Sequence, residues 1–358
     1  MKYRLEKSTA PAYLQLYEQM RAEIVSGVYA FGARLPSKRL IAEELGISTI
    51  TVAHTYALLC DEGYATARER SGFFVAFRAT DGFAIPEKKK TAPAPHTVTA
   101  GDHFPFSVLA KTMRRVLAEY GDGILEQTAG AGCIALRQAI ADYLARNRGI
   151  YVTTEQIVIG SGAEYLYGMI VELLGADRRY AIEAPSYEKI ERVYAARGVQ
   201  CAHLPMGEEG IEAEALASTD AQVLHISPFR SFPTGITASA SKRHAYVRWA
   251  SEGARVLVED DYASEISVSA KTEETLFALS GQDNVIYLNT FSCTVSPAVR
   301  VGYMVLPKHL VSVFGERLGF YACTVPTFEQ LVLAELLASG DFERHINRLR
   351  RKKRAEMQ

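Results

Sequence analysis

Three short segments of the sequence combine residue types that could bind a small charged molecule. In "GSGAE" a glycine turn leads into a helix expected to begin at Ala163. The backbone N–H groups of Gly162 and Ala163 then point out of the helix start, where a phosphate could bind. In "VEDDY" the carboxylate of Asp260 follows an apolar run, and a buried acid needs a cation or a hydrogen-bond donor. "TFSCTVSPAVRVGY" adds hydroxyl groups, Cys293 and Arg300. Each segment also has a purely structural interpretation, as a turn, a helix cap or a strand end.

The elements around these segments are those of an α/β domain. Residues 156–159 are expected to form a strand, and "RRYAIEAPSY", "AQVLHISPFRSFPTG" and "ARVLVEDDYASE" are each expected to be an apolar strand that ends in polar or aromatic residues. Helical patterns separate them, which predicts βαβ units and a mostly parallel sheet within residues 105–358. In open sheets of this kind, ligands bind beyond the carboxyl ends of the strands.

The composition is that of a globular protein of the reducing cytosol. The 358 residues are 48% hydrophobic and carry a formal net charge of −1. The five cysteines form no CxxC pair and no cluster with zinc spacing, which argues against a disulfide framework or a metal site. The first residues lack the apolar core of an export signal, and no apolar run is long enough to cross a membrane. We therefore predict a cytoplasmic protein.

Residues 79–104 separate the α/β region from a block formed by residues 1–78. This segment contains prolines, a lysine run and small polar residues without hydrophobic periodicity, so we interpret it as a linker. The block before it predicts a helix at Pro11–Ser26 and two more that follow the caps Ser37 and Ser48. Two strands around a turn at 69–72 would then form a wing.

The second and third helices, joined by a glycine turn, form a helix-turn-helix pattern. Periodicity predicts that the three helices bury Leu16, Met20 and Ile24, then Leu40, Ile41 and Leu45, then Val52, Tyr56 and Leu59. Basic residues stand at helix starts and in the wing, where DNA phosphates would lie: Arg34, Lys38, Arg39, Arg68 and Arg70. The alternative is a small helical domain whose polar residues are merely solvated.

This block resembles the winged helix-turn-helix domain of the GntR family of bacterial transcription regulators. The resemblance rests on "YLQLYEQMRAEIVSGVYAFGARLPSKRLIAEELGISTITVAHTYALLCDEGY" together with "RSGFFV". It implies that Arg39 contacts the DNA backbone or bases and that Thr51 binds phosphate. Family members usually have an arginine at the position of Thr49, so a changed affinity or sequence preference is expected. The predicted DNA-binding residues are Arg34, Lys38, Arg39, Ser48, Thr49, Thr51, Arg70, Ser71 and Gly72, the last two placing the wing in the minor groove.

The rest of the chain resembles the fold-type I aminotransferases, which hold pyridoxal 5'-phosphate (PLP). The motifs appear in the order "FPF", "LRQAIADYL", "RG", "SGAE", "EAPSY", "SFPTG", "EDDY", "TFSC" and "RVGY", and after a GntR-like head this order resembles the MocR subfamily. The resemblance implies that Asp260 pairs with the pyridine nitrogen, Tyr262 bonds the phenolic oxygen and Tyr187 stacks on the ring. It implies a phosphate site made of Gly162, Ala163, Thr290, Ser292 and Arg300.

Cys293 stands at the position of the lysine that forms the Schiff base in this family. A lysine amine holds the aldehyde covalently and moves the substrate proton, and a thiol does neither. We therefore expect PLP to bind noncovalently and ordinary transamination to be lost. The chain ends at "RHINRLRRKKRAEMQ", whereas relatives continue through a small C-terminal subdomain, so a truncated aminotransferase-like domain is expected.

The predicted function is a DNA-binding transcription regulator with a PLP-binding effector domain that lacks the Schiff-base lysine. Its expected partners are an operator in double-stranded DNA, a small amine or amino-acid effector and a second copy of the chain. One alternative is a PLP-dependent aminotransferase-type enzyme with a vestigial DNA-binding head, against which Cys293 argues. Another is a decayed reading frame that folds poorly.

Overall fold

The computed structural model describes residues 3–5, 10–68, 71–77, 104–267, 274–281 and 284–356. The chain divides into two compact units, residues 1–97 and 98–358, and each is described by itself. The expected linker lies outside the described residues except for its last residue, Phe104, which is buried. Arg70 lies outside them as well. No described helix has both the length and the apolar character needed to cross a membrane.

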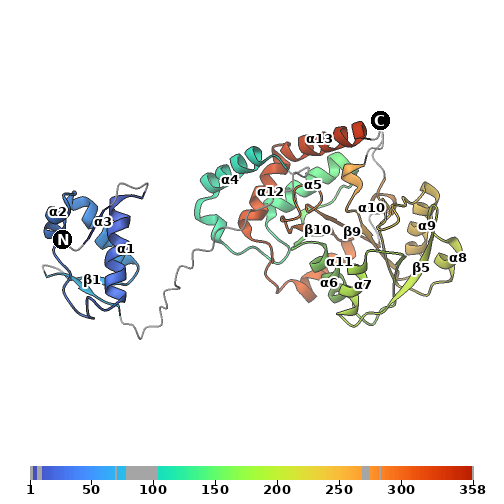
Figure 1. The fold of residues 1–358 in the computed structure, drawn as a ribbon. Coiled ribbons are helices and arrows are strands. Elements are labelled where there is room, and N and C mark those ends of the chain that lie inside the picture. Colours follow the sequence, from blue (N-terminus) through green and yellow to red (C-terminus); the bar gives the residue numbers. More distant parts are fainter. Residues whose placement is uncertain are drawn as a thin grey trace. The chain divides into compact units, whose positions relative to one another are not determined.

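The first unit is a winged helix-turn-helix (Figure 1). The hydroxyl of Ser37 caps α2 (Lys38–Leu45) by accepting a bond from the Leu40 N–H at 3.2 Å, and that of Ser48 caps α3 (Thr49–Asp61) by accepting one from the Ile50 N–H at 3.2 Å. Between them Gly46 adopts a left-handed conformation, with a φ of 62°, and turns the chain into the next helix. Its elements are α1 (Ala12–Val25), α2 (Lys38–Leu45), α3 (Thr49–Asp61) and the antiparallel strands β1 (Ala65–Arg68) and β2 (Gly72–Val75).

The core of this unit matches the helical periodicity on α1 and α3 but not on all of α2. The residues predicted to be buried on α1 and α3 are all buried: Leu16, Met20, Ile24, Val52, Tyr56 and Leu59. On α2 the prediction for Leu40 is wrong, because its side chain is 49% exposed, and Leu45 is only half-buried. Ile41 and Ala42 take the buried positions, since a helix of two turns packed on one side buries only a narrow stripe.

The second unit is built on an eight-stranded sheet with the order β3-β10-β9-β8-β7-β4-β5-β6. Strands β5, β4, β7, β8 and β9 run parallel, while β10 runs antiparallel to both of its neighbours, as β6 does to β5, so the sheet is mostly parallel as predicted. The strands are β3 (Ile157–Gly160), β4 (Tyr180–Ala184), β5 (Cys201–Gly207), β6 (Gly210–Ile211), β7 (Val223–Ile226), β8 (Val256–Asp260), β9 (Val285–Thr290) and β10 (Gly302–Val305). The first strand begins one residue later than expected, because residues 154–156 form a 3-10 turn.

Helices cover both faces of this sheet (Figure 1). Successive strand residues point to opposite faces, so Leu257 packs in one core and Val258 in the other. One core lies under α6 (Ala163–Leu174), α7 (Glu188–Ala195) and α11 (Lys308–Leu318). The other lies under α4 (Phe106–Tyr120), α5 (Ile134–Arg148), α9 (Ala240–Ser251), α10 (Leu276–Leu279), α12 (Thr327–Ala338) and α13 (Asp341–Glu356), and the short helix α8 (Ala213–Ser218) contributes Leu216 to it.

Candidate functional site

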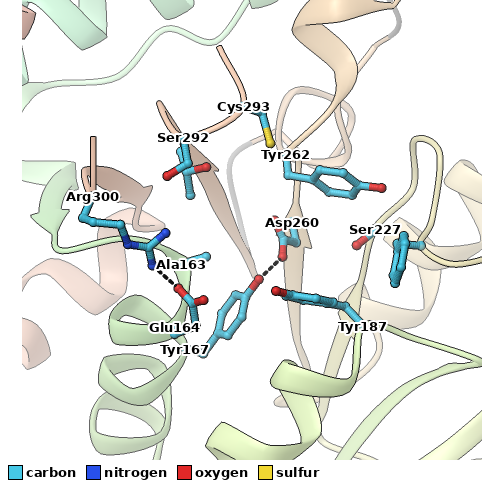
Figure 2. A pocket seen from close by; sticks show the side chains of 12 residues that line it. Ala163, Glu164, Tyr167, Tyr187, Ser227, Asp260, Tyr262, Ser292, Cys293 and Arg300 are labelled. Carbon is cyan, nitrogen blue, oxygen red and sulfur yellow. Dashed lines mark hydrogen bonds and ion pairs between the residues drawn. The ribbon is translucent and has the colours of Figure 1, made fainter. Parts of the chain in front are cut away.

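A pocket of about 270 Å³ lies in the second unit, where β8 and β9 end and α6 begins. It brings together residues that lie far apart in the sequence, as the topology of an open parallel sheet predicts. Seven of the eight residues proposed for the cofactor line it, and Cys293 lines it with them (Figure 2). These seven are Ala163, Tyr187, Asp260, Tyr262, Thr290, Ser292 and Arg300. The eighth, Gly162, is the N-cap of α6 and lies against Arg300.

Asp260 is the last residue of β8 and is only 3% exposed. The hydroxyl of Tyr167, on α6, donates a hydrogen bond to Oδ2 of this carboxylate. Nε2 of His225, on β7, lies 3.6 Å from the same oxygen. Oδ1 has no hydrogen-bond partner among the described residues. A buried carboxylate oxygen without a donor is costly, so this atom is free to accept a bond from a ligand.

The groups behind Asp260 fix its orientation. Nδ1 of His225 and the hydroxyl of Tyr194 lie 2.7 Å apart, so the imidazole is held by α7 from one side. Burial raises the pKa of Tyr167 well above its usual range, and the Asp260 charge raises it further. The phenol therefore stays protonated and donates to the carboxylate at any ordinary pH.

The start of α6 forms the other end of the pocket. Gly162 has a φ of 91°, which a residue with a side chain rarely adopts, and a Cβ there would lie 2.6 Å from Nη2 of Arg300. The turn can therefore hold a guanidinium close to the N-terminus of a helix, where anions bind. The hydroxyl of Ser292 donates to the Val299 carbonyl at 3.0 Å, which ties down the loop between β9 and β10. Thr290 closes this side at the end of β9.

Arg300 has a partner within the pocket. Its Nη2 contacts Oε2 of Glu164, the second residue of α6, and Nζ of Lys189 contacts Oε1 of the same carboxylate at 2.9 Å. The pKa of Glu164 is lowered to about 2 despite partial burial, because Lys189, the backbone N–H of Glu164 and Arg300 stabilise the charge. Glu164 is thus an anion at the position where the sequence predicts phosphate.

Aromatic side chains form the walls of the pocket. The rings of Tyr187 and Phe232 meet edge to face with 5.9 Å between their centroids. The hydroxyl of Tyr262 donates to the Arg230 carbonyl at 2.6 Å, so it is engaged with the backbone rather than pointing free into the pocket. The pKa of Tyr262 is raised mainly by burial and, to a smaller extent, by the charge of Asp260.

Cys293 lines the pocket, is exposed, and lies next to Tyr262 in Figure 2. The pKa of its thiol is raised, first by partial burial of the sulfur within the pocket and then by the charges of Glu265 and Asp260. The neutral thiol is therefore the dominant form near neutral pH. Among the described residues that line the pocket there is no lysine. Within the described ranges, no three His, Cys, Asp or Glu side chains come together as a metal site would require.

Some lining residues escaped the sequence interpretation: Glu164, Tyr167, Ser227 and Phe232. Helical spacing could have found Tyr167, because it follows Ala163 by four residues and so lies on the same face of α6. Glu164 stood within the quoted turn but was given no role. His225 gave no signal, because its position in the middle of an apolar strand says nothing of the neighbour it meets.

Apart from Arg70, which lies outside the described residues, the predicted DNA-binding residues lie at the start of α2, at the start of α3 and in or beside the wing, where Arg34 forms a β-bridge with Phe74. Arg34, Lys38, Arg39, Ser48, Thr49 and Ser71 are exposed, and Thr51 and Gly72 are half-buried. Ser48 uses its hydroxyl to cap α3. A Cβ at Gly72, which has a φ of 104°, would lie 3.3 Å from Nε of Arg34, so the wing turn and this arginine are neighbours.

Comparison with known proteins assigns each unit to a family. Residues 12–75 match the family "Bacterial regulatory proteins, gntR family", and residues 98–357 match "Aminotransferase class I and II". YdeL of Bacillus subtilis, an uncharacterized HTH-type transcriptional regulator, is 31% identical over 96% of this chain and 78% of its own length. PdxR of Corynebacterium glutamicum, an HTH-type pyridoxine biosynthesis transcriptional regulator, is 31% identical over 94% of this chain and 75% of its own length. MocR of Rhizobium meliloti, a probable rhizopine catabolism regulatory protein, is 27% identical over 95% of this chain and 74% of its own length.

Among solved structures, the α-aminoadipate aminotransferase LysN of Thermus thermophilus superposes on this chain with a TM-score of 0.62 and 28% identity. The match covers 69% of this chain and 64% of LysN, so the chain spans less than two thirds of that enzyme. Both units and their order along the chain are therefore accounted for. The chain belongs to the MocR-like subfamily of GntR-family transcriptional regulators, in which a winged helix-turn-helix is joined to an aminotransferase-like domain.

Proposed function

We propose that this DNA-binding regulator holds PLP noncovalently in the pocket of its aminotransferase-like unit and uses it as a ligand sensor rather than for transamination. The observation that carries this proposal is Oδ1 of Asp260, which has no partner within the described part of the chain and is buried at one end of a pocket whose other end has Arg300 beside the start of α6. A protonated ring nitrogen and a phosphate complement these two ends.

The residues of the pocket fit the cofactor at three points. Asp260, held by Tyr167, would accept the proton of the pyridine nitrogen on its free oxygen. Gly162, Ala163, Thr290, Ser292 and Arg300 would receive the phosphate, and the missing side chain at Gly162 leaves the backbone accessible. Tyr187 would lie against the ring, and Tyr262 would lie near the phenolic oxygen. The relative PdxR is named as a regulator of pyridoxine biosynthesis, which agrees with a cofactor of this class.

The side chain at position 293 decides between sensing and catalysis. PLP, when bound, supplies an aldehyde that condenses with amines and a ring that withdraws electrons. Cys293 cannot hold that aldehyde as an imine, and its neutral thiol is a poor base for moving a proton from carbon. An amine ligand would therefore be held without being turned over.

The test is a titration of the purified chain with PLP, followed by absorbance and by equilibrium dialysis. Saturable binding that borohydride does not make covalent would support the proposal. An absence of binding at saturating cofactor would refute it. Conversion of the cofactor that depends on added amino acid would instead favour the aminotransferase-type enzyme.

We further propose that the protein acts on operator DNA in the cytoplasm as a homodimer, with an amine or amino acid as effector. The GntR match supports the operator. Apolar side chains that a second copy could cover are exposed in the second unit: Phe106 at 80%, Leu125 at 81% and Phe320 at 76%. Sedimentation equilibrium with and without an operator fragment tests the dimer, and a mass of one chain at micromolar concentration would contradict it.

A further inference from the structure

The carboxylate of Glu164 bridges two cations at the phosphate end of the pocket. Oε2 contacts Arg300 and Oε1 contacts Lys189, so each oxygen has a different partner. The side chain of Glu164 is 29% exposed, whereas those of Arg300 and Lys189 are 49% and 55% exposed. The carboxylate is thus the least exposed of the three groups, and it lies at the first turn of α6, where the helix dipole also stabilises a negative charge.

One of these contacts, the one with Arg300, is a contact that a bound phosphate would also make. A phosphate at this site would take hydrogen bonds from the guanidinium of Arg300 and from the backbone at the start of α6. Glu164 already pairs with Nη2 of that guanidinium, and its pKa of about 2 keeps the carboxylate charged over the whole physiological range. A phosphate dianion that enters the pocket therefore meets a carboxylate that holds the same arginine.

We propose that Glu164 is an internal anion that competes with the phosphate of a ligand for Arg300, and that it thereby sets the affinity and the phosphate selectivity of the pocket. This proposal rests on the proposed PLP function. Oδ1 of Asp260, for which the described residues supply no donor, independently indicates that the same pocket takes a ligand with a hydrogen-bond donor.

Because Glu164 also pairs with Lys189, a phosphate can replace Glu164 as the partner of Arg300 without leaving the carboxylate unpaired. When a phosphate takes Arg300, Oε1 of Glu164 can keep its contact with Lys189, which lies on α7. The two cations then serve two anions, the carboxylate and the phosphate, in place of one. Binding exchanges one ion pair for another instead of exposing a bare carboxylate to the dianion.

The experiment compares the full chain with its Glu164→Gln variant and measures the Kd for three probes: PLP, pyridoxal and inorganic phosphate. Removing the competing charge should lower the Kd for PLP and for inorganic phosphate by about two- to fivefold, the range of a partly exposed ion pair. Pyridoxal, which has no phosphate, should bind with an unchanged Kd. Glu172→Gln is the matched control, because Glu172 also lies on α6 and pairs with Arg197 at 3.4 Å without lining the pocket.

A double variant separates competition for Arg300 from general repulsion. If Glu164 acts by holding Arg300, Glu164→Gln should have little effect in an Arg300→Gln background, whereas simple repulsion would persist there. An unchanged PLP Kd in Glu164→Gln, or an equal gain in Glu172→Gln, would overturn the proposal while leaving PLP binding intact. Failure of every protein, wild type included, to bind PLP would instead overturn the proposed function. Circular dichroism checks the fold, and Glu164→Ala replaces the first variant if it does not fold.

Discussion

Tyr167 donates its phenolic hydrogen to Oδ2 of Asp260 and leaves Oδ1 of the same carboxylate buried without a partner among the described residues. The two residues stand 93 positions apart and come from a helix and a strand. Because one oxygen is satisfied by the protein, the carboxylate keeps a fixed orientation and offers only the other oxygen to a ligand. This asymmetry is what a site for a single directed hydrogen bond requires.

Replacing Asp260 by asparagine should weaken PLP binding by about ten- to a hundredfold, because the amide carries no charge to pair with a protonated ring nitrogen. Equilibrium dialysis of the purified variant measures the change. Asp142→Asn is a suitable control, since Asp142 lies on α5 and does not line the pocket. Unchanged binding in Asp260→Asn would remove the carboxylate from the proposed cofactor site.

Replacing Cys293 by lysine should restore covalent attachment. An amine there would reach into the same pocket between Asp260 and Arg300. Incubation with PLP followed by borohydride should then add the mass of the reduced cofactor to the variant but not to the wild type or to Cys293→Ala. If wild type gained the same mass, another lysine would be the site of attachment, and peptide mapping would identify it.

The stability of the second unit should fall between pH 4.5 and about 7 partly because of Glu183. Burial raises the pKa of this carboxyl to about 7, against the opposing hydrogen bonds from Ser231 and the Ser227 backbone. The stability it contributes is fully present below its ordinary pKa and is lost as the pH rises through the folded-state value, by up to about 3 kcal/mol. Calorimetry at pH 5 and pH 8 should show a smaller loss in Glu183→Gln than in wild type. Equal losses in the two proteins would show that Glu183 is not responsible.

Arg39 should contribute to DNA affinity through phosphate. We expect Arg39→Ala to bind an operator fragment less tightly and to reduce the slope of log K against log salt by about 1. Thr49→Arg should increase both the affinity for DNA and the salt slope, because it adds a cation at the exposed start of α3. Arg146→Ala, which alters an ion pair in the second unit, is the control. A salt slope that stays the same in Arg39→Ala would contradict the assignment.

The two neighbouring apolar residues of α2 should differ strongly in their contribution to stability. Ile41 is 1% exposed, so Ile41→Ala should cost about 2–4 kcal/mol, whereas Leu40→Ala, at a side chain that is half exposed, should cost less than about 1 kcal/mol. Hydrogen exchange of the α3 amides measures the free energy of opening of this unit. A larger loss in Leu40→Ala would show that another surface covers Leu40.

Much of the architecture follows from local properties of the sequence. The caps Ser37 and Ser48, the glycine turn between the two helices and the alternation of apolar strands with helices are short-range features, and each is found where it was predicted. They succeed because capping, turn geometry and periodicity depend on a few neighbouring residues. The family and the order of its motifs could likewise be read from the chain.

The contacts between side chains from different elements could not be predicted in this way. Leu40 fits the apolar stripe of α2 in sequence but faces away from the core, because packing on α3 fixes the rotation of a two-turn helix. The residues that orient Asp260 come from α6 and β7, and the anion that holds Arg300 comes from the first turn of α6.

The sequence by itself determined the two units, the helix starts and turns, and the set of residues gathered at the strand ends. Only the tertiary structure decided that Asp260 keeps one free oxygen, that Tyr262 is engaged by a backbone carbonyl, and that Glu164 holds Arg300. Hydrogen bonds and ion pairs depend on distances of a few ångströms between segments that are remote in the chain. Those distances are set by sheet order and helix packing, which local sequence patterns do not encode.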